Sequence, residues 1–155
     1  MIIRRAPMFI VNTEAAIYKD GRYLLCKRSE KEDHAPGGLA LIGGKVEMEG
    51  ASSDILERTV AREVEEEVRL VIEGRPQYVH STSFVTDRGE PVVNVIFLCE
   101  RFSGEPCAVS AEVGAVYWMT PEEVYGNPDA AEYLKDSIRK AEAVRMKGIS
   151  VYSND

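Results

Sequence analysis

The segment from Asp54 to Val68 constrains the fold of this chain most strongly, because its side chains repeat with the period of an α-helix. Leu56, Val60, Val64 and Val68 recur every fourth residue and form one apolar stripe. Such a stripe must be buried against other elements, since most of the stability of a helix in a protein comes from packing its apolar face. The segment therefore predicts an amphipathic helix that packs on the core of a folded domain.

The same helix carries glutamates three and four residues apart. Glu63, Glu66 and Glu67 project within about 100° of arc and border the apolar stripe, whereas Glu65 points toward solvent. Three neighbouring carboxylates repel one another unless a cation lies among them, and their hard oxygens suit Mg²⁺ or Mn²⁺. Upstream, Gly43-Gly44 would let the backbone approach the same place closely. Acidic runs on helices are more often solvated faces, so the glutamates alone leave both interpretations open.

The rest of the chain alternates between strand-like and helical runs, with no repeat or interdomain linker. This order predicts one domain over residues 1–155 with an α+β fold, an α/β/α sandwich around a central mixed β-sheet. Thr120, followed by Pro121, predicts the start of a short helix. Strands are expected at 13–18, 22–27, 39–46 (interrupted by the glycine pair), 77–86, 92–101 and 113–119, and a last helix at 129–147, ended by Gly148.

The composition excludes several classes of protein. A net charge of −7 argues against binding to a nucleic-acid polymer, but not against a small phosphate compound that metal ions bridge to the protein. No apolar run approaches the roughly 18 residues of a membrane span, and no signal-like stretch follows the N-terminus, so a cytoplasmic location is the default expectation. Cys26, Cys99 and Cys107 lack zinc-site spacing, and the first two read as buried free thiols.

The residues Arg62 to Leu70 resemble the second half of the Nudix box, with Gly44 at its opening glycine and Gly43 before it. The resemblance extends over residues 10–145. It implies a Nudix-type fold and a MutT-like, Mg²⁺-dependent pyrophosphohydrolase, with Mn²⁺ as the other candidate metal. Such an enzyme cleaves the pyrophosphate bond of a nucleoside diphosphate linked to another moiety.

The chain departs from the Nudix box at three places. A four-residue insertion falls within Glu47 to Ser53, and Asp54 stands where the family has its first glutamate. Asp54 could pair with Arg62 as in the family only if the backbone moves closer. With Glu57 it resembles a capping box, and Ser52 or Ser53 could also serve as the N-cap. Arg69 replaces the terminal glycine. Either Arg69 keeps a left-handed cap at a cost of roughly 1 kcal/mol, or the helix runs on.

The resemblance also implies roles for individual side chains. Arg62 orients the carboxylates rather than touching substrate, because it can pair with Glu66 one turn on. Members of the family differ in their general base, and either Glu63 or Glu112 is expected here; Glu112 precedes a predicted strand and is otherwise a solvated loop acid. The implied metal ligands are Glu66 and Glu67, with Glu63, Glu112 and the backbone carbonyl of Gly44.

The identity of the substrate remains open at this level. Arg28 ends a predicted strand at a position that contacts phosphate in similar proteins, and Lys45 follows the glycines; either could instead lie on the surface. A nucleoside triphosphate or modified nucleotide is the default substrate, and a nucleotide sugar or ADP-ribose is the alternative. The changes at Asp54 and Arg69 keep a second hypothesis open, a regulatory module that binds a nucleotide without hydrolysing it. Homodimers are common in the family, so a homodimer is the expected assembly if the chain has one.

Overall fold

The computed structural model describes residues 7–28, 37–109 and 113–152. Strands and helices follow one another along the chain as β1 (Ile10–Lys19), β2 (Arg22–Arg28), β3 (Leu39–Ala40), β4 (Ile42–Lys45), α1 (Ile55–Val68), β5 (Val71–Ile72), β6 (Gln77–Val85), β7 (Pro91–Cys99), β8 (Phe102–Ser103), β9 (Val113–Met119), α2 (Pro121–Tyr125) and α3 (Glu132–Tyr152). Within these ranges, no helix has the length and apolar character needed to cross a bilayer.

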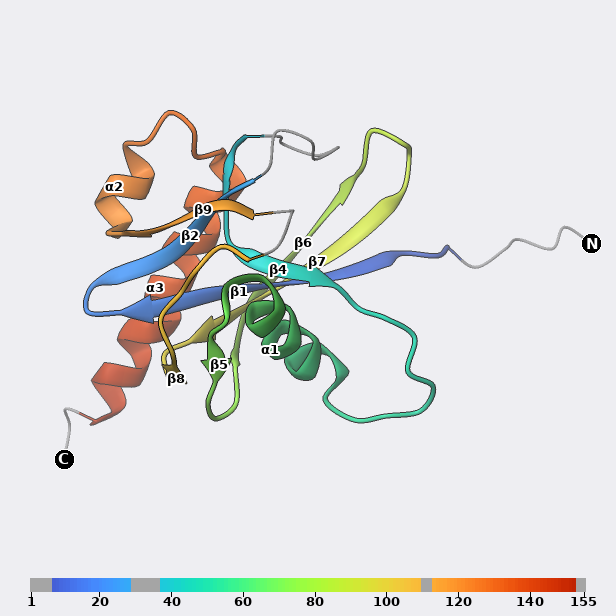
Figure 1. Ribbon diagram of the computed structural model, residues 1–155, viewed down its shortest axis with the longest axis horizontal. Coiled ribbons are helices and arrows are strands. Elements are labelled where there is room, and N and C mark those ends of the chain that lie inside the picture. The colour runs from blue at the N-terminus through green and yellow to red at the C-terminus, as the bar shows by residue number, and fades with distance from the viewer. Residues whose placement is uncertain (1–6, 29–36, 110–112, 153–155) are drawn as a thin grey trace, which may run out of the picture.

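The central sheet is mixed. Its strand order is β3-β2-β1-β7-β6, with β4 also paired to β1 and β9 also paired to β2. β1 and β7 run parallel, from Ile10 opposite Val92 to Ile17 opposite Cys99, while the other pairs in this sheet are antiparallel. β1 therefore lies at the centre of the molecule, with β4 and β7 alongside it (Figure 1).

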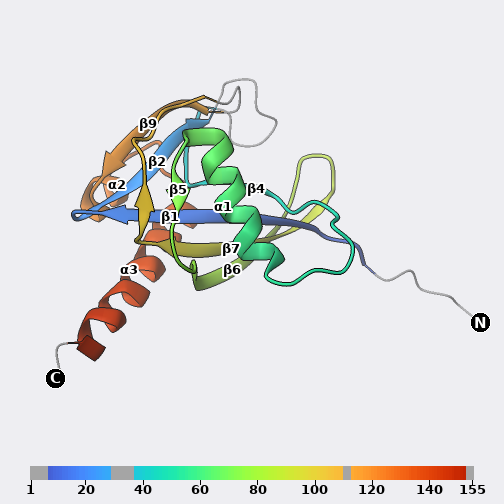
Figure 2. The same cartoon turned by 60° about the horizontal axis from the view of Figure 1, so that its bottom comes forward.

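Helices cover both faces of this sheet (Figures 1 and 2). On one face, α1 buries Val60, Val64 and Val68 in a core cluster, as the period of its apolar residues predicts. On the other face, Leu134 and Ile138 of α3 join a second buried cluster, to which α2 also contributes. The predicted α+β fold, an α/β/α sandwich with a central mixed sheet, is confirmed.

Both ends of α1 are unusual. Asp54 at the N-cap has a left-handed backbone, with φ 56°, and its side chain makes no capping bond. The predicted capping box is therefore wrong, because the Asp54 carboxylate is paired with Arg75 at 3.0 Å instead. At the other end, Arg69 has φ 61° and donates its N–H to the Glu65 carbonyl at 3.0 Å. Of the two alternatives for Arg69, the structure has the left-handed cap.

Three details differ from the predicted elements. Helix α3 continues through Gly148, because one helical glycine costs only about 1 kcal/mol and no end-capping turn forms there. The strand predicted at 39–46 is interrupted at Leu41, and both glycines lie inside β4. The two-residue strands β5 and β8, which pair with each other, were not predicted, since such short runs show no periodicity.

Candidate active site

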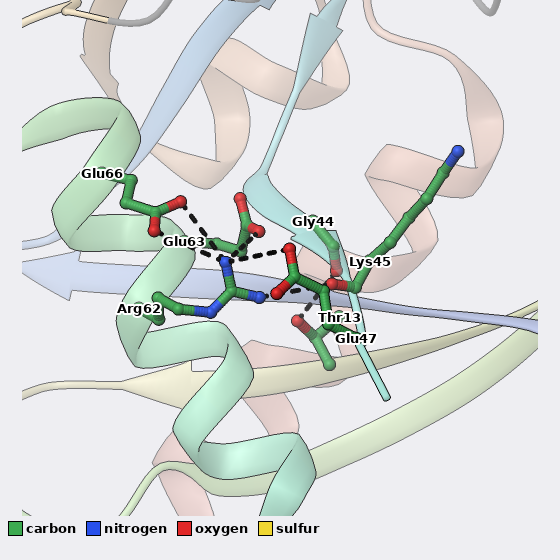
Figure 3. Close-up of polar contacts among 7 residues, drawn as sticks. All are labelled: Thr13, Gly44, Lys45, Glu47, Arg62, Glu63 and Glu66. Carbon is green, nitrogen blue, oxygen red and sulfur yellow. Dashed lines mark hydrogen bonds and ion pairs between the residues drawn. The ribbon is translucent and has the colours of Figure 1, made fainter. Parts of the chain in front are cut away.

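The glycine pair lies where β1, β4 and α1 come closest together. β4 pairs with β1 so that Gly43 faces Glu14 and Gly44 faces Thr13. A Cβ atom on Gly43 would overlap the backbone carbonyl of Thr13, and one on Gly44 would overlap the carboxylate of Glu63. The Thr13 hydroxyl donates to the Gly44 carbonyl at 3.2 Å (Figure 3). Gly43 thus permits the strand pairing, and Gly44 permits α1 to place a carboxylate on the strand.

Arg62 is the centre of the polar contacts around Gly44 (Figure 3). Its Nη1 atom lies 3.0 Å from Glu63 Oε1, 3.4 Å from Glu66 Oε2 and 3.9 Å from Glu47 Oε1. Its Nη2 atom donates to the Lys45 carbonyl at 3.5 Å. Partial burial lowers the pKa of Arg62, but the charges of Glu63, Glu47 and Glu66 outweigh it and raise the pKa above its ordinary value. The predicted pairing of Arg62 with Glu66 is present, and the same guanidinium also joins α1 to β4.

The glutamates of α1 lie at different depths. Glu67 is only 6% exposed. Burial raises the pKa of the Cys26 thiol to about 12, and the negative charge of Glu67 adds to this increase. The side chain of Glu63 is 14% exposed, and that of Glu66 is 58% exposed. Glu65 is exposed, as predicted. Glu66 was expected at the inner border of the helix and instead lies largely in solvent, held by its ion pair.

The predicted metal ligands are of the chemical type that a hard divalent cation prefers, although their side chains are not gathered around one point. Among the described residues, no three His, Cys, Asp or Glu side chains are grouped closely enough to hold a metal ion. The Arg62 guanidinium instead neutralises Glu63 and Glu66. Carboxylate oxygens and a backbone carbonyl are suitable ligands for Mg²⁺, and Gly44 leaves open the space that a Cβ would fill. Glu112, the other predicted ligand, lies outside the described residues.

A cavity of about 420 Å³ opens beside β4, within the size range of small-molecule sites. Both residues predicted to meet phosphate, Arg28 and Lys45, line it together with Gly43. The side chains of Phe84 and Tyr133 add aromatic surface. Two cations from different strands therefore share one concave surface next to the glycine pair.

The cavity also contains a polar network that was not predicted from the sequence. Asn12 donates to Asn94 Oδ1 at 2.8 Å, and Asn94 donates to the Glu14 carboxylate, across the parallel pair β1 and β7. Burial raises the pKa of Glu14, against the opposing effects of the Asn94 hydrogen bond and the charge of Arg28. The signal was present in the sequence, because Asn12 and Glu14 are two residues apart and so share one face of a strand.

The inserted loop contacts the first turns of α1. Arg58 binds Glu49 of the loop at 2.8 Å and the Ser52 hydroxyl at 2.9 Å. Asp54, paired with Arg75, does not take the family's role of pairing with the arginine at the centre of the site. Arg58 and Arg75 thus hold this end of α1, where the family would use the first glutamate of the box.

Fold and site together define an α/β/α protein that brings a glycine pair, an arginine and several glutamates beside a cavity lined in part by cationic side chains. The family model described as "NUDIX domain" matches residues 8–140. The chain therefore belongs to the Nudix family.

Curated relatives agree with this assignment. The uncharacterized Nudix hydrolase YfcD of Escherichia coli K12 is 38% identical over 129 residues, covering 82% of this chain and 66% of the relative. A Nudix hydrolase of Yersinia pestis, also uncharacterized, is 33% identical over 120 residues, covering 77% of this chain and 61% of the relative. The chain thus spans about two thirds of the length of the YfcD protein that it matches.

Solved structures have the same fold. The MutT NUDIX hydrolase of Burkholderia pseudomallei superposes with a TM-score of 0.73 at 30% identity, covering 86% of this chain and 98% of that one. The MutT protein of Methanosarcina mazei Go1 superposes with a TM-score of 0.76 at 24% identity, covering 92% of this chain and 99% of that one. At this identity the likeness supports the fold alone.

Proposed function

We propose that the chain is a Mg²⁺-dependent hydrolase that cleaves the pyrophosphate bond of a nucleoside diphosphate linked to another moiety. A nucleoside triphosphate or modified nucleotide is the expected substrate. The observation that carries this proposal is the contact between α1 and β4, where Arg62 holds Glu63 beside Gly44 next to a cavity lined by Arg28 and Lys45. Family membership and the names of the relatives support hydrolysis as the type of reaction.

The carboxylates of Glu63, Glu66 and Glu67 and the carbonyl of Gly44 would hold the cation. A bound Mg²⁺ neutralises phosphate oxygens and lowers the pKa of the attacking water. Arg62 would position Glu63 and Glu66, because its guanidinium already contacts both. Of the two candidate bases, Glu63 is the one that the structure describes. It lies against Gly44 and is held by Arg62, so its carboxylate is well placed to accept a proton from water.

Two cations would hold the phosphate groups of the substrate. The protein carries a net charge of −7, which repels a polyphosphate at long range. Arg28 and Lys45 provide positive charge at the cavity itself, and Arg28 can form the bidentate contacts that suit phosphate oxygens. Metal ions would balance the remaining negative charge.

Pyrophosphatase activity with Mg²⁺ tests the proposal directly. The screen covers nucleoside triphosphates, nucleotide sugars and ADP-ribose, with released phosphate measured after enzymatic conversion of the products. Glu66→Gln removes a proposed ligand, and we expect it to lower kcat by about tenfold or more. Glu65→Gln is the matched control, because Glu65 is the neighbouring exposed glutamate and has no proposed role. The proposal fails if wild type cleaves none of these compounds, or if the two variants retain equal activity.

One observation favours the other hypothesis, a module that binds nucleotide without hydrolysing it. Asp54 pairs with Arg75, so the first carboxylate of the box is not bound to Arg62. A module of this kind would bind nucleotides in calorimetry and show no turnover in the same screen.

A further inference from the structure

The cavity floor contains a buried polar network within an otherwise apolar sheet. Asn94 is 4% exposed and lies between Val93 and Val95 on β7, where an apolar residue would be expected. Its amide donates to Glu14 and its carbonyl accepts from Asn12 at 2.8 Å. Both ends of the amide are therefore used, which fixes its orientation and, through it, the Glu14 carboxylate.

Glu14 presents an acceptor to the cavity that it lines. A carboxylate has two oxygens, and Asn94 donates to one of them, Oε1. Phosphate groups would be attracted to the cations of Arg28 and Lys45 rather than to the acidic side chain of Glu14. Glu14 thus gives the cavity a hydrogen-bond acceptor in addition to the cationic side chains of Arg28 and Lys45.

We propose that Glu14, held by Asn94 and Asn12, determines specificity by accepting hydrogen bonds from neutral N–H or O–H groups on the nucleoside part of the substrate. This inference rests on the proposed function, since it assumes that a nucleotide occupies the cavity. The donors tested below are the exocyclic amine of a base and the 2′-hydroxyl of a ribose, because each can be replaced without changing the rest of the nucleotide. A site built to hydrogen-bond such a donor rejects analogues that lack it, because its buried acceptor is then left unpaired.

Glu14→Gln tests the role of the carboxylate with little change in shape. The glutamine carbonyl can still accept from Asn94, so its NH₂ group then faces the cavity as a donor. The variant therefore replaces an acceptor by a donor while keeping the contact inside the sheet. An unchanged urea midpoint would show that the fold is retained, and Glu105→Gln, at an exposed glutamate in the loop after β8, controls for the loss of one charge.

The measurement is the Kd of nucleoside monophosphates without metal, by calorimetry. GMP with IMP, AMP with IMP and CMP with UMP compare ligands with and without an exocyclic amine, and each ribonucleotide with its 2′-deoxy form tests the hydroxyl. We expect wild type to prefer the amine-bearing or 2′-hydroxyl-bearing member of one comparison by about tenfold or more, and Glu14→Gln to remove that preference. The proposal is overturned if wild type binds none of them or has no preference, or if Glu14→Gln shifts every Kd equally, as simple charge removal would.

The role of Glu14 in binding and the proposed hydrolysis can be refuted separately. If wild type cleaves no compound in the Mg²⁺ screen but Glu14→Gln removes the binding preference, the role of Glu14 stands and the proposed hydrolysis is wrong. If wild type hydrolyses nucleotides and Glu14→Gln keeps the same ratio of kcat/KM between amine-bearing and amine-lacking substrates, only the role of Glu14 is wrong.

Discussion

Replacing Arg69 by glycine should stabilise the protein. Arg69 has a left-handed backbone with φ 61° and ψ 27°, which costs an L-residue roughly 1–2 kcal/mol and costs glycine nothing. The greater freedom of glycine in the unfolded chain offsets about 0.4–1 kcal/mol of this gain. The Arg69 side chain is exposed, so its loss removes little packing. The net expectation is about 1 kcal/mol of added stability, or a rise in Tm of about 2–4 °C for a chain of this size.

Urea unfolding measures this difference well. The only tryptophan of the chain, Trp118, stacks on Phe102 with ring centroids 6.0 Å apart and reports loss of tertiary structure by fluorescence, while circular dichroism reports the helices. A higher midpoint at an unchanged slope identifies a gain in stability of the folded state. Arg69→Ala should lie within about 0.5 kcal/mol of wild type, because alanine keeps the Cβ that strains this conformation.

Glu65→Gly, a glycine substitution within the same helix, is the matched control. Glu65 is exposed in the interior of α1, where glycine should destabilise by about 1 kcal/mol. The same residue introduced four positions apart should therefore act with opposite sign. The reasoning is refuted if Arg69→Gly leaves the midpoint unchanged or lowers it, or if Arg69→Ala stabilises as much as glycine does.

The two glycines of β4 should respond differently to alanine. Gly44→Ala should lower kcat by about tenfold or more with a small change in urea midpoint, because its Cβ displaces the flexible end of Glu63. Gly43→Ala should lower the free energy of unfolding by more than about 1 kcal/mol, because its Cβ meets backbone; equal effects on kcat and stability would contradict both assignments. His80 should make stability depend on pH: burial and the charge of Lys140 lower its pKa in the folded state, although Asp136 opposes them. The unfolded chain then takes up a proton at His80 more readily, so the contribution of His80 to stability is greatest above about pH 6.5 and falls as the pH drops below it. Urea midpoints at pH 7.5 and 5.5 should differ less in His80→Gln than in wild type, and an equal difference in both would refute this.

Local periodicity made part of the structure predictable. The apolar stripe of α1 and the exposure of Glu65 follow from spacing along one helix, and the structure has both. The N-cap was not predictable, because the partner of Asp54 is Arg75, whose position depends on the tertiary fold. The ion pair of Glu66 with Arg62, one turn away on the same helix, was predictable from spacing, whereas the exposure of Glu66 was not.

The polar network of the cavity depends on strand register. Asn12 and Asn94 lie 82 residues apart, and each interrupts an apolar strand when the strands are considered separately. Only the parallel register of β1 with β7 shows that these positions face each other. Arg28 and Lys45 were easier to select as candidates for phosphate contact, because each follows a recognisable local pattern, and both line the cavity.

The parallel pairing of β1 and β7 also has a consequence for synthesis of the chain. β1 is complete at Lys19, but its neighbour β7 ends at Cys99. At about 5–20 residues per second, a ribosome needs roughly 4–16 s to make the residues in between. The hairpin partner β2 and then β4 emerge during that interval, so one edge of β1 can be covered while the other stays open. The side of β1 that carries the cavity network is thus among the later parts of the sheet to close, and a nascent chain halted before β7 would expose it to chaperones.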